Sequence, residues 1–387
     1  MKFALNWSGR PLARGGSSKS QTARLAALRW TVAAWLVAFS ASAADLKTRN
    51  VFLLTTDGLR WQEVFSGAEE SLIIKENGGV SNTNDLRAAY WRPTPEARRE
   101  ALLPFIWGKI AKEGQLWGNR NRGSVVRVTN GHNFSYPGYS EFLTGVADAR
   151  IDSNDRKPNP NVNVFQWLQA RPEFNGRVGA AVSWGVIPWI LNADTAKFPV
   201  WSAFDLPAGA NRFALSPAVQ TLLDRTTPMW GDVSLDTFTG AAAREMLTQF
   251  RPRALYVAYG ETDDWAHEGR YDRYLHAAHN FDRFVGELWT LVQSLPDYRN
   301  QTTFILTTDH GRGPAPIAWK NHGKAIAESA SLWLGILGPD TPALGERSDS
   351  PEATQGQVAA TVAAALGLDF NTPHPKAAKP LPQVLPH

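Results

Sequence analysis

Four short apolar runs, each followed by a polar turn, constrain the fold of this chain more than any other feature of its sequence. They span residues 50–56, 177–184, 253–259 and 302–306. Runs of this length that end in turn residues are typical of strands buried on both faces of a parallel sheet. Longer segments with helical spacing, such as 271–294, separate them. The sequence therefore predicts an α/β fold around one central sheet.

Carboxylate and imidazole groups follow three of these runs. Because functional groups collect beyond the carboxyl ends of parallel strands, we expect these side chains to converge at one edge of the sheet. The candidates share a position at or soon after the end of a predicted strand: Asp57, Asp263, His267, Asp309, His310 and His322.

A turn between the first two runs contains a candidate nucleophile, Ser135. Pro137 fixes φ at a value suited to the first turn of a helix, and Gly138 permits close approach of backbone or ligand. Ser135 is therefore expected at or just before a helix N-terminus, where unpaired N–H groups and the helix dipole favour an anion such as phosphate or sulfate. Alone, a Ser in this place is more often a helix cap. The neighbouring candidate ligands favour the interpretation of Ser135 as a nucleophile.

These residue types suit two divalent cations, with zinc the first candidate and manganese the second. The chain has no cysteine, so histidine, aspartate and glutamate are its only strong ligands. Two such ions can bind the attacking and leaving oxygens of a phosphoryl displacement, and a metal-bound serine hydroxyl loses its proton near neutral pH. His276 and His279 fit the face of a helix and are not counted as ligands.

The first 43 residues predict an export signal. They hold six of the 40 basic residues and no acidic residue, and an apolar run at 30–39 is followed by small residues at 41–43. A membrane anchor needs about 20 apolar residues, so we predict a cleaved signal, a periplasmic or secreted protein, and no stable membrane insertion. The rest of the chain is close to neutral, which gives no indication of a nucleic-acid polymer as partner.

The remaining sequence predicts one domain over 44–370. Irregular segments at about 66–93 and 185–235 are expected to be insertions that shape the site. The last residues, 371–387, contain five prolines, and we expect a loose tail there.

The order of the motifs resembles the alkaline phosphatase superfamily, in particular its nucleotide pyrophosphatase/phosphodiesterase-like branch. The resemblance covers most of the chain after the export signal, and each motif is short. The matching elements are Asp57-Gly58, Ser135-Tyr136-Pro137, Thr144-Gly145, Asp263-x-x-x-His267, Asp309-His310-Gly311 and His322-Gly323. This resemblance implies a three-layer sandwich, with a mostly parallel sheet between two layers of helices. It also implies an exported, metal-dependent hydrolase of small phosphoric esters, either a phosphodiesterase or a phosphatase.

The resemblance further implies a role for each candidate. Three residues match the ligands of one metal: Asp263, His267 and His322. Four match those of the other: Asp57, Asp309, His310 and the Ser135 hydroxyl. Ser135 matches the nucleophile that attacks phosphorus and forms a covalent phosphoryl intermediate. Asn154, or else Asn133, matches an asparagine that holds a phosphate oxygen, although both residues are also common in turns.

Two departures from the superfamily leave the substrate open. Its sulfatases have Arg four residues after the nucleophile, where this chain has Tyr139, and the lack of Cys closes the usual aerobic route to formylglycine. The phosphodiesterase branch usually has Thr followed by Phe-Pro-Asn, where this chain has Ser135 followed by Tyr-Pro-Gly. The alternatives are a sulfuric-ester hydrolase, a phosphomutase or phosphotransferase on the same core, and a non-catalytic protein that binds phosphorylated ligands.

Overall fold

A nine-stranded sheet forms the centre of this computed structural model, which describes residues 46–386. The strands are β1 (Asn50–Thr56), β2 (Gln115–Trp117), β4 (Val178–Val182), β5 (Pro199–Trp201), β6 (Asn211–Arg212), β7 (Ala254–Tyr259), β8 (Thr302–Thr307), β9 (Leu334–Leu337) and β10 (Gly345–Glu346). Their order is β10-β2-β9-β8-β1-β7-β4-β5-β6. Neighbours are parallel except β9, which runs antiparallel to β8 and β2. A second sheet pairs β3 (Val126–Arg127) with β11 (Ala353–Thr354).

The four predicted strands form the middle of the sheet, side by side as β8, β1, β7 and β4. Thr55 of β1 pairs with Thr307 of β8 and with Ala258 of β7, so these strands end at the same level. The segments that follow them therefore leave the sheet along one edge.

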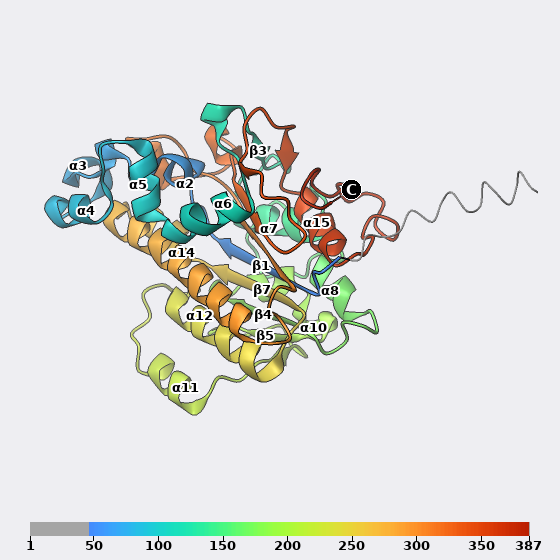
Figure 1. The fold of residues 1–387 in the computed structure, drawn as a ribbon. Helices are drawn as coiled ribbons and strands as arrows, with labels where there is room; N and C mark the ends of the chain where they lie inside the picture. The colour runs from blue at the N-terminus through green and yellow to red at the C-terminus, as the bar shows by residue number, and fades with distance from the viewer. Residues whose placement is uncertain (1–45, 387) are drawn as a thin grey trace, which may run out of the picture. The chain divides into compact units, whose positions relative to one another are not determined.

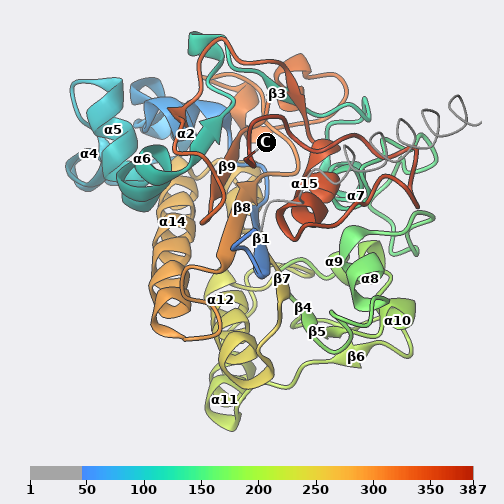
Figure 2. The same ribbon diagram turned by 45° about the vertical axis from the view of Figure 1, so that its right-hand side comes forward.

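Helices cover both faces of the sheet. Alternate residues of β1 belong to two separate apolar clusters, Val51 and Leu53 to one and Phe52 and Leu54 to the other. The first face is covered by α7 (Ser135–Thr144), α8 (Val164–Gln169), α9 (Ile187–Ile190), α10 (Ala193–Ala196) and α15 (Gln357–Ala365). The second is covered by α2 (Trp61–Ser66), α5 (Pro95–Leu102), α12 (Asp236–Glu245) and α14 (Tyr271–Ser294). Figures 1 and 2 show α12 and α14 on one side and α8 and α15 on the other, which confirms the predicted three-layer arrangement.

Short helices complete the described region. They are α3 (Lys75–Gly78), α4 (Thr83–Tyr90), α6 (Ala111–Glu113), α11 (Pro217–Asp224) and α13 (Glu261–His267). The 3₁₀ and π turns are η1 (Glu70–Leu72), η2 (Ile106–Ile110), η3 (Arg120–Arg122), η4 (Met246–Phe250), η5 (Ala318–Lys320) and η6 (Ala327–Ala330). Within residues 46–386, no helix is long and apolar enough to cross a lipid bilayer.

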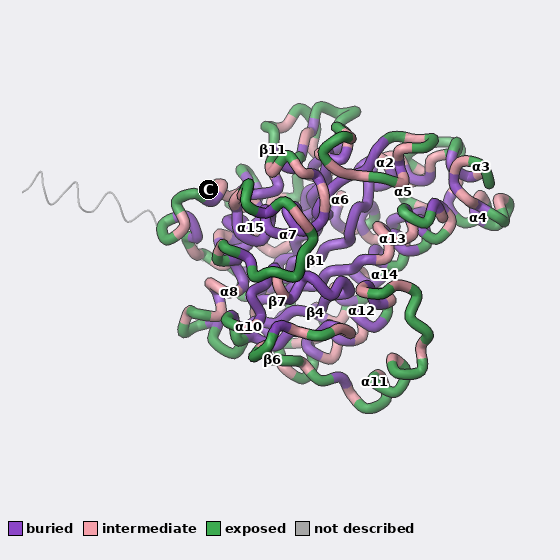
Figure 3. The backbone as a smooth tube through the Cα atoms, turned by 180° about the vertical axis from the view of Figure 1, so that it is seen from behind, coloured by how far each residue is buried: buried purple, intermediate pink, exposed green. Residues whose placement is uncertain are grey.

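The segment at 185–235, expected to be an insertion, carries α11, which stands out as exposed in Figure 3. The predicted export signal at 1–43 lies outside the described residues. The expectation of a loose tail after residue 370 was wrong. Leu381 and Val384 are buried, and the Leu381 N–H donates to Thr361 Oγ1 of α15 at 2.9 Å. The apolar residues between the prolines pack against the alanine-rich α15 and hold the tail.

Candidate active site

Ser135 is the first residue of α7, in agreement with the turn chemistry of its segment. Its Oγ is buried and lies 3.4 Å from His310 Nε2. Gly138, one turn further on, allows α7 to approach the backbone of Asp309, because a Cβ at this position would lie 2.3 Å from the Asp309 carbonyl oxygen. The predicted close approach at Gly138 is thus present, and it places Ser135 beside the end of β8.

Asp57, Asp309 and His310, which we call the buried ligand group, lie beyond the ends of β1 and β8. One oxygen of each carboxylate is already held. The Tyr139 hydroxyl donates to Asp57 Oδ2 at 2.9 Å, and the Gly58 N–H donates to Asp309 Oδ1 at 3.0 Å. Among the described residues, Asp57 Oδ1 and Asp309 Oδ2 are buried without a hydrogen-bond partner. They lie 3.3 and 3.4 Å from His310 Nε2, so three candidate ligand atoms converge on one point.

The electrostatics of this group call for a cation. His310 Nδ1 lies 2.9 Å from the Gly311 carbonyl oxygen, to which it donates when it carries the proton, and this leaves Nε2 free to coordinate. Burial and then the charge of Asp263 raise the pKa of Asp57 well above its ordinary value. Burial and then the charge of Asp57 do the same to the pKa of Asp309. A divalent metal at this point would compensate the negative charge and use both free oxygens, so the residues fit the predicted ion.

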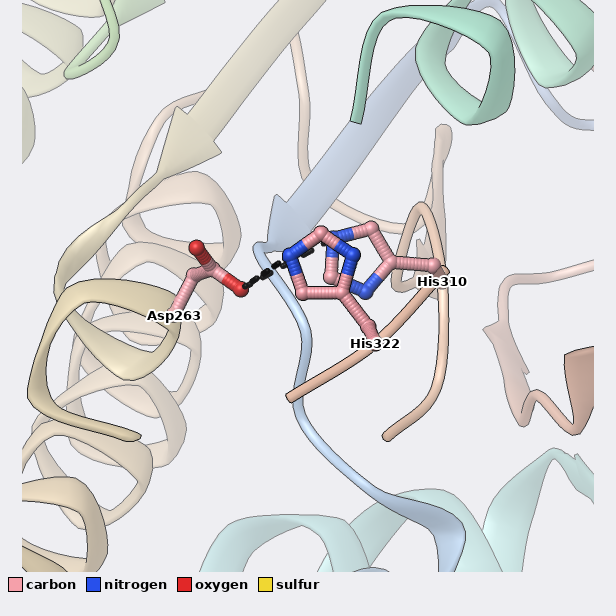
Figure 4. Close-up of side chains that lie close together, drawn as sticks. All are labelled: Asp263, His310 and His322. Carbon is pink, nitrogen blue, oxygen red and sulfur yellow. Dashed lines mark ion pairs between the residues drawn. The ribbon is translucent and has the colours of Figure 1, made fainter. Parts of the chain in front are cut away.

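Asp263, His267 and His322, which we call the outer ligand group, come from α13 and from the loop after η5. His267 Nε2 lies 3.2 Å from Asp263 Oδ2 and 3.0 Å from His322 Nε2. His322 Nε2 lies 3.6 Å from Asp263 Oδ1, and these two side chains face each other in Figure 4. The side chain of His267 is 43% exposed, whereas that of His310 is fully buried.

His310 lies between the two groups. Its Nε2 is 3.7 Å from Asp263 Oδ1, and its ring stacks on that of His322 with centroids 3.8 Å apart. Burial, followed by the charge of His310, lowers the pKa of His322, which is therefore neutral at pH 7 and able to coordinate a metal. The structure thus places all six predicted side chains in one continuous site next to Ser135.

The sequence interpretation missed Arg312, a fully buried cation beside the outer ligand group. Arg312 Nη1 pairs with Asp263 Oδ1, while Nε and Nη2 donate to the carbonyl oxygens of Trp319 and Lys320 at 2.8 and 2.6 Å. Burial is the largest influence and would raise the pKa of Asp263, but Arg312, His322 and His267 together outweigh it and hold this pKa well below its ordinary value. The one feature of the sequence that could have indicated Arg312 is its position two residues after His310.

The two candidate asparagines occupy different places. Asn154 lines a cleft beside Ser135, and its Oδ1 accepts the N–H of Tyr136 at 2.9 Å, so it caps the start of α7 with its carbonyl oxygen. Its NH₂ group is the part that can donate to a ligand. Asn133 adopts the left-handed conformation at φ 55°, and its carbonyl oxygen lies 3.4 Å from His322 Nδ1. Asn133 therefore forms a turn that supports His322.

A cleft of about 260 Å³ opens onto the two ligand groups. Its walls are Asp57, Ser135, Asn154, Trp184, Asp232, Val233, Gly260, Asp263 and Asp264. Neither a lysine nor an arginine of the described region lines it. Burial and the neighbouring carboxylates, Asp263 first, raise the pKa of Asp264 to about 9. Asp264 is therefore protonated and uncharged near neutral pH, and the cleft is lined by carboxyl groups without a cationic side chain among the described residues.

Neither a protein-family model nor a curated protein sequence matches this chain. Several solved structures share its fold. Alkaline phosphatase PafA has a TM-score of 0.54 and 10% identity, covering 88% of this chain and 99% of its own. Ps i-CgsB, in complex with k-i-k-neocarrahexaose, has a TM-score of 0.51 and 18% identity, covering 86% and 75%. Phosphonate monoester hydrolase SpPMH from Silicibacter pomeroyi has a TM-score of 0.50 and 13% identity, covering 86% and 76%. The chain thus has the predicted alkaline-phosphatase-like fold.

Proposed function

We propose that this protein is an exported, metal-dependent hydrolase of phosphoric esters that uses Ser135 as its nucleophile. The observation that carries this proposal is the pair of buried, unpartnered oxygens on Asp57 and Asp309, which meet His310 Nε2 beside Ser135 Oγ. Unpartnered oxygens in a buried place are costly unless a cation binds them. The superfamily fold supports the same class of chemistry, and the basic and apolar segment at 1–43 supports export.

The residues present fit two divalent ions. The candidate ligand atoms of Asp57, Asp309 and His310 lie within 4.8 Å of one another, as do those of Asp263, His310 and His322. We assign the first three, with Ser135, to one ion. We assign Asp263 and His322, with His267, to the other, and the mixed oxygen and nitrogen donors favour zinc. When bound, such ions lower the pKa of the serine hydroxyl and stabilise the negative charge on the phosphoryl group.

The chain itself supplies the positioning of the nucleophile and the substrate. Ser135, at the start of α7, and Asn154 both line the cleft, and the capping bond of Asn154 leaves its NH₂ group as the donor for a phosphate oxygen. Attack of Ser135 Oγ on phosphorus forms the Oγ–phosphorus bond and breaks the bond to the leaving group, and the serine proton balances the departing alcohol. Water then attacks phosphorus, breaks the Oγ–phosphorus bond, restores the serine hydroxyl and releases the phosphate product.

The lack of cationic side chains in the cleft walls favours a monoanionic ester over a dianionic one. A phosphodiester carries one negative charge, whereas a phosphomonoester carries two near neutral pH. The cleft walls contain four aspartates, of which Asp264 is protonated near neutral pH, and no lysine or arginine of the described region that could pair with the second charge. We therefore propose phosphodiesters as the substrate class.

Metal content and activity on the purified protein test this proposal. We expect bound zinc or manganese, loss of activity on chelation, and faster hydrolysis of bis-p-nitrophenyl phosphate than of p-nitrophenyl phosphate or p-nitrophenyl sulfate. A preference for the sulfate would show a sulfuric-ester hydrolase. Absence of both metal and turnover would favour a non-catalytic binding protein.

Ser135→Ala should lower kcat by about three orders of magnitude or more, with the metal content retained. Ser140→Ala is the matched control, because Ser140 is a buried serine of the same helix whose Oγ accepts from Asn159 at 2.9 Å. Activity of the Ser135 variant within about tenfold of that of the Ser140 variant would show that another group is the nucleophile.

A further inference from the structure

A second cavity, of about 320 Å³, lies under α11. Its volume falls within the roughly 300–1,000 Å³ of small-molecule sites. Its apolar lining includes Phe204, Leu223, Met229, Val233, Leu235 and Phe238. We call it the α11 pocket. All of these residues except Phe238, which belongs to α12, come from the 185–235 segment.

The α11 pocket adjoins the catalytic cleft at two points. Val233 lines both cavities and forms a bridge with Trp184, another wall of the cleft. Phe204 packs against Gly185, the residue after Trp184. A Cβ placed on Gly185 would lie only 3.0 Å from the Phe204 Cβ. A molecule that fills the cleft therefore has the α11 pocket beside it, with Val233 as a wall of both cavities.

The segment around the α11 pocket leaves apolar surface in contact with water. None of the residues of α11 is buried, and Met229, in the wall of the pocket, is 54% exposed. Phe204 and Leu223 are each only partly buried. Apolar side chains gathered around a hollow beside a polar cleft are typical of a surface that covers the apolar part of a ligand.

We propose that the α11 pocket binds an apolar alkyl or aryl ester group of the substrate, whose ionic centre lies in the catalytic cleft. This inference rests on the proposed function and adds a substrate class to it, namely monoanionic esters that carry a hydrophobic chain. The polar, carboxyl-lined walls of the cleft do not suit such a chain, whereas the apolar side chains of the α11 pocket do.

A chain-length series tests the inference. The methyl, butyl and hexyl esters of p-nitrophenyl phosphate differ only in the group that would enter the α11 pocket. Each methylene that the pocket takes from water should raise kcat/KM by about three- to fourfold until the pocket is full.

Two adjacent leucines of α11 provide a matched pair of variants. Leu223 lines the α11 pocket, whereas Leu222 is 63% exposed and does not. Leu223→Gln should reduce the hexyl-to-methyl ratio of kcat/KM at least tenfold, and Leu222→Gln should leave it near the wild-type value. Far-ultraviolet circular dichroism of both variants checks that they fold.

A flat series in the wild type, or equal ratios in the two variants, would overturn the inference while leaving the hydrolase intact. Failure to hydrolyse any ester would instead count against the proposed function. Binding of the apolar dye 1-anilinonaphthalene-8-sulfonate then tests, independently of activity, whether the α11 pocket binds apolar groups. Weaker binding in Leu223→Gln alone supports it, and equal binding in both variants rejects it.

Discussion

The buried and the outer ligand groups differ in how their side chains are held, although each consists of three. Asp57, Asp309 and His310 follow central strands, and neighbouring donors fix the carboxylate oxygens that do not face the site. In the outer group, His267 lies on a short helix with 43% of its side chain exposed, and His322 lies on a loop. The buried group is therefore preorganised by the sheet, whereas the outer group depends on segments that pack at its edge.

The two groups should therefore differ in how well they tolerate substitution. In the buried group, water has little access to replace a lost ligand atom, and a lost charge alters a fully desolvated cluster. In the outer group, solvent can reach the place of a lost His267 imidazole, whose side chain is 43% exposed. Arg312, moreover, remains as a counter-charge for Asp263.

Asp309→Asn should have the largest effect. It keeps an oxygen for the Gly58 N–H but removes the charge of the unpartnered oxygen, so we expect kcat/KM to fall by about three orders of magnitude or more. Excess zinc should not restore it. The control is Asp297→Asn, an exposed aspartate paired with Arg251, which should retain wild-type activity. Rescue of Asp309→Asn by zinc would remove the distinction between the two groups.

His267→Ala should have a smaller and reversible effect. We expect about a ten- to hundredfold loss of activity at low free zinc, because solvent can take the place of an exposed imidazole. Titration with zinc should recover most of it. An unrecoverable loss comparable to that of Asp309→Asn would show that the two groups are equally rigid.

Tyr139→Phe tests the support of the buried group without removing a ligand. Without its hydroxyl, Asp57 loses the donor that orients it, so we expect about tenfold weaker zinc binding, measured by competition with a chelating dye. Tyr256→Phe is the matched control. Tyr256 is equally buried, but its hydroxyl contacts Thr55 Oγ1 at 3.3 Å and no candidate ligand. Equal zinc affinities in the two variants would exclude a positioning role for Tyr139.

The smallest expected effect is a pH dependence of the metal-free protein. The pKa values of Asp57 and Asp309 lie above the ordinary 3.8 in the fold, so the folded state binds more protons than the unfolded state in this window. The free energy of unfolding should therefore decrease as pH rises from about 4 towards their raised pKa values. The pKa of Asp263 is lowered in the fold, so this residue has the opposite effect on the free energy of unfolding. Its stabilising contribution is present above the ordinary pKa of 3.8 and is lost as pH falls below that value.

Urea unfolding at several pH values, with a chelator and with zinc, measures this dependence. Asp57→Asn should flatten the decrease in the metal-free protein, and zinc should remove it, because a bound cation keeps both carboxylates charged. A wild-type slope that Asp57→Asn leaves unchanged would contradict the raised pKa values.

Much of the fold could be predicted because the signals were local. The run at 50–56 coincides with β1, and the spacing at 271–294 coincides with α14. The convergence of Asp57, Asp263 and His310 followed from a general property of parallel strands, which end along one edge. Their roles as ligands and the role of Ser135 as nucleophile remain predictions.

Other features depend on contacts between distant segments and left no local signal. Arg312 is buried only because Asp263 and two carbonyl groups of a later loop surround its guanidinium. The prolines of the tail indicated a loose segment, but Leu381 and Val384 found apolar partners on the first face of the sheet. The open helix terminus expected at Ser135 is also partly satisfied, since Asn154 accepts the N–H of Tyr136.

The hydrogen bond between Gly58 and Asp309 joins residues 251 positions apart in the sequence. Neither half of the chain can therefore assemble the buried group alone, and loop closure over this distance must precede it. Capture of a metal by this group should be a late event in folding, after β1 has paired with β8. The time at which zinc binding appears during refolding would thus report when the central sheet is complete.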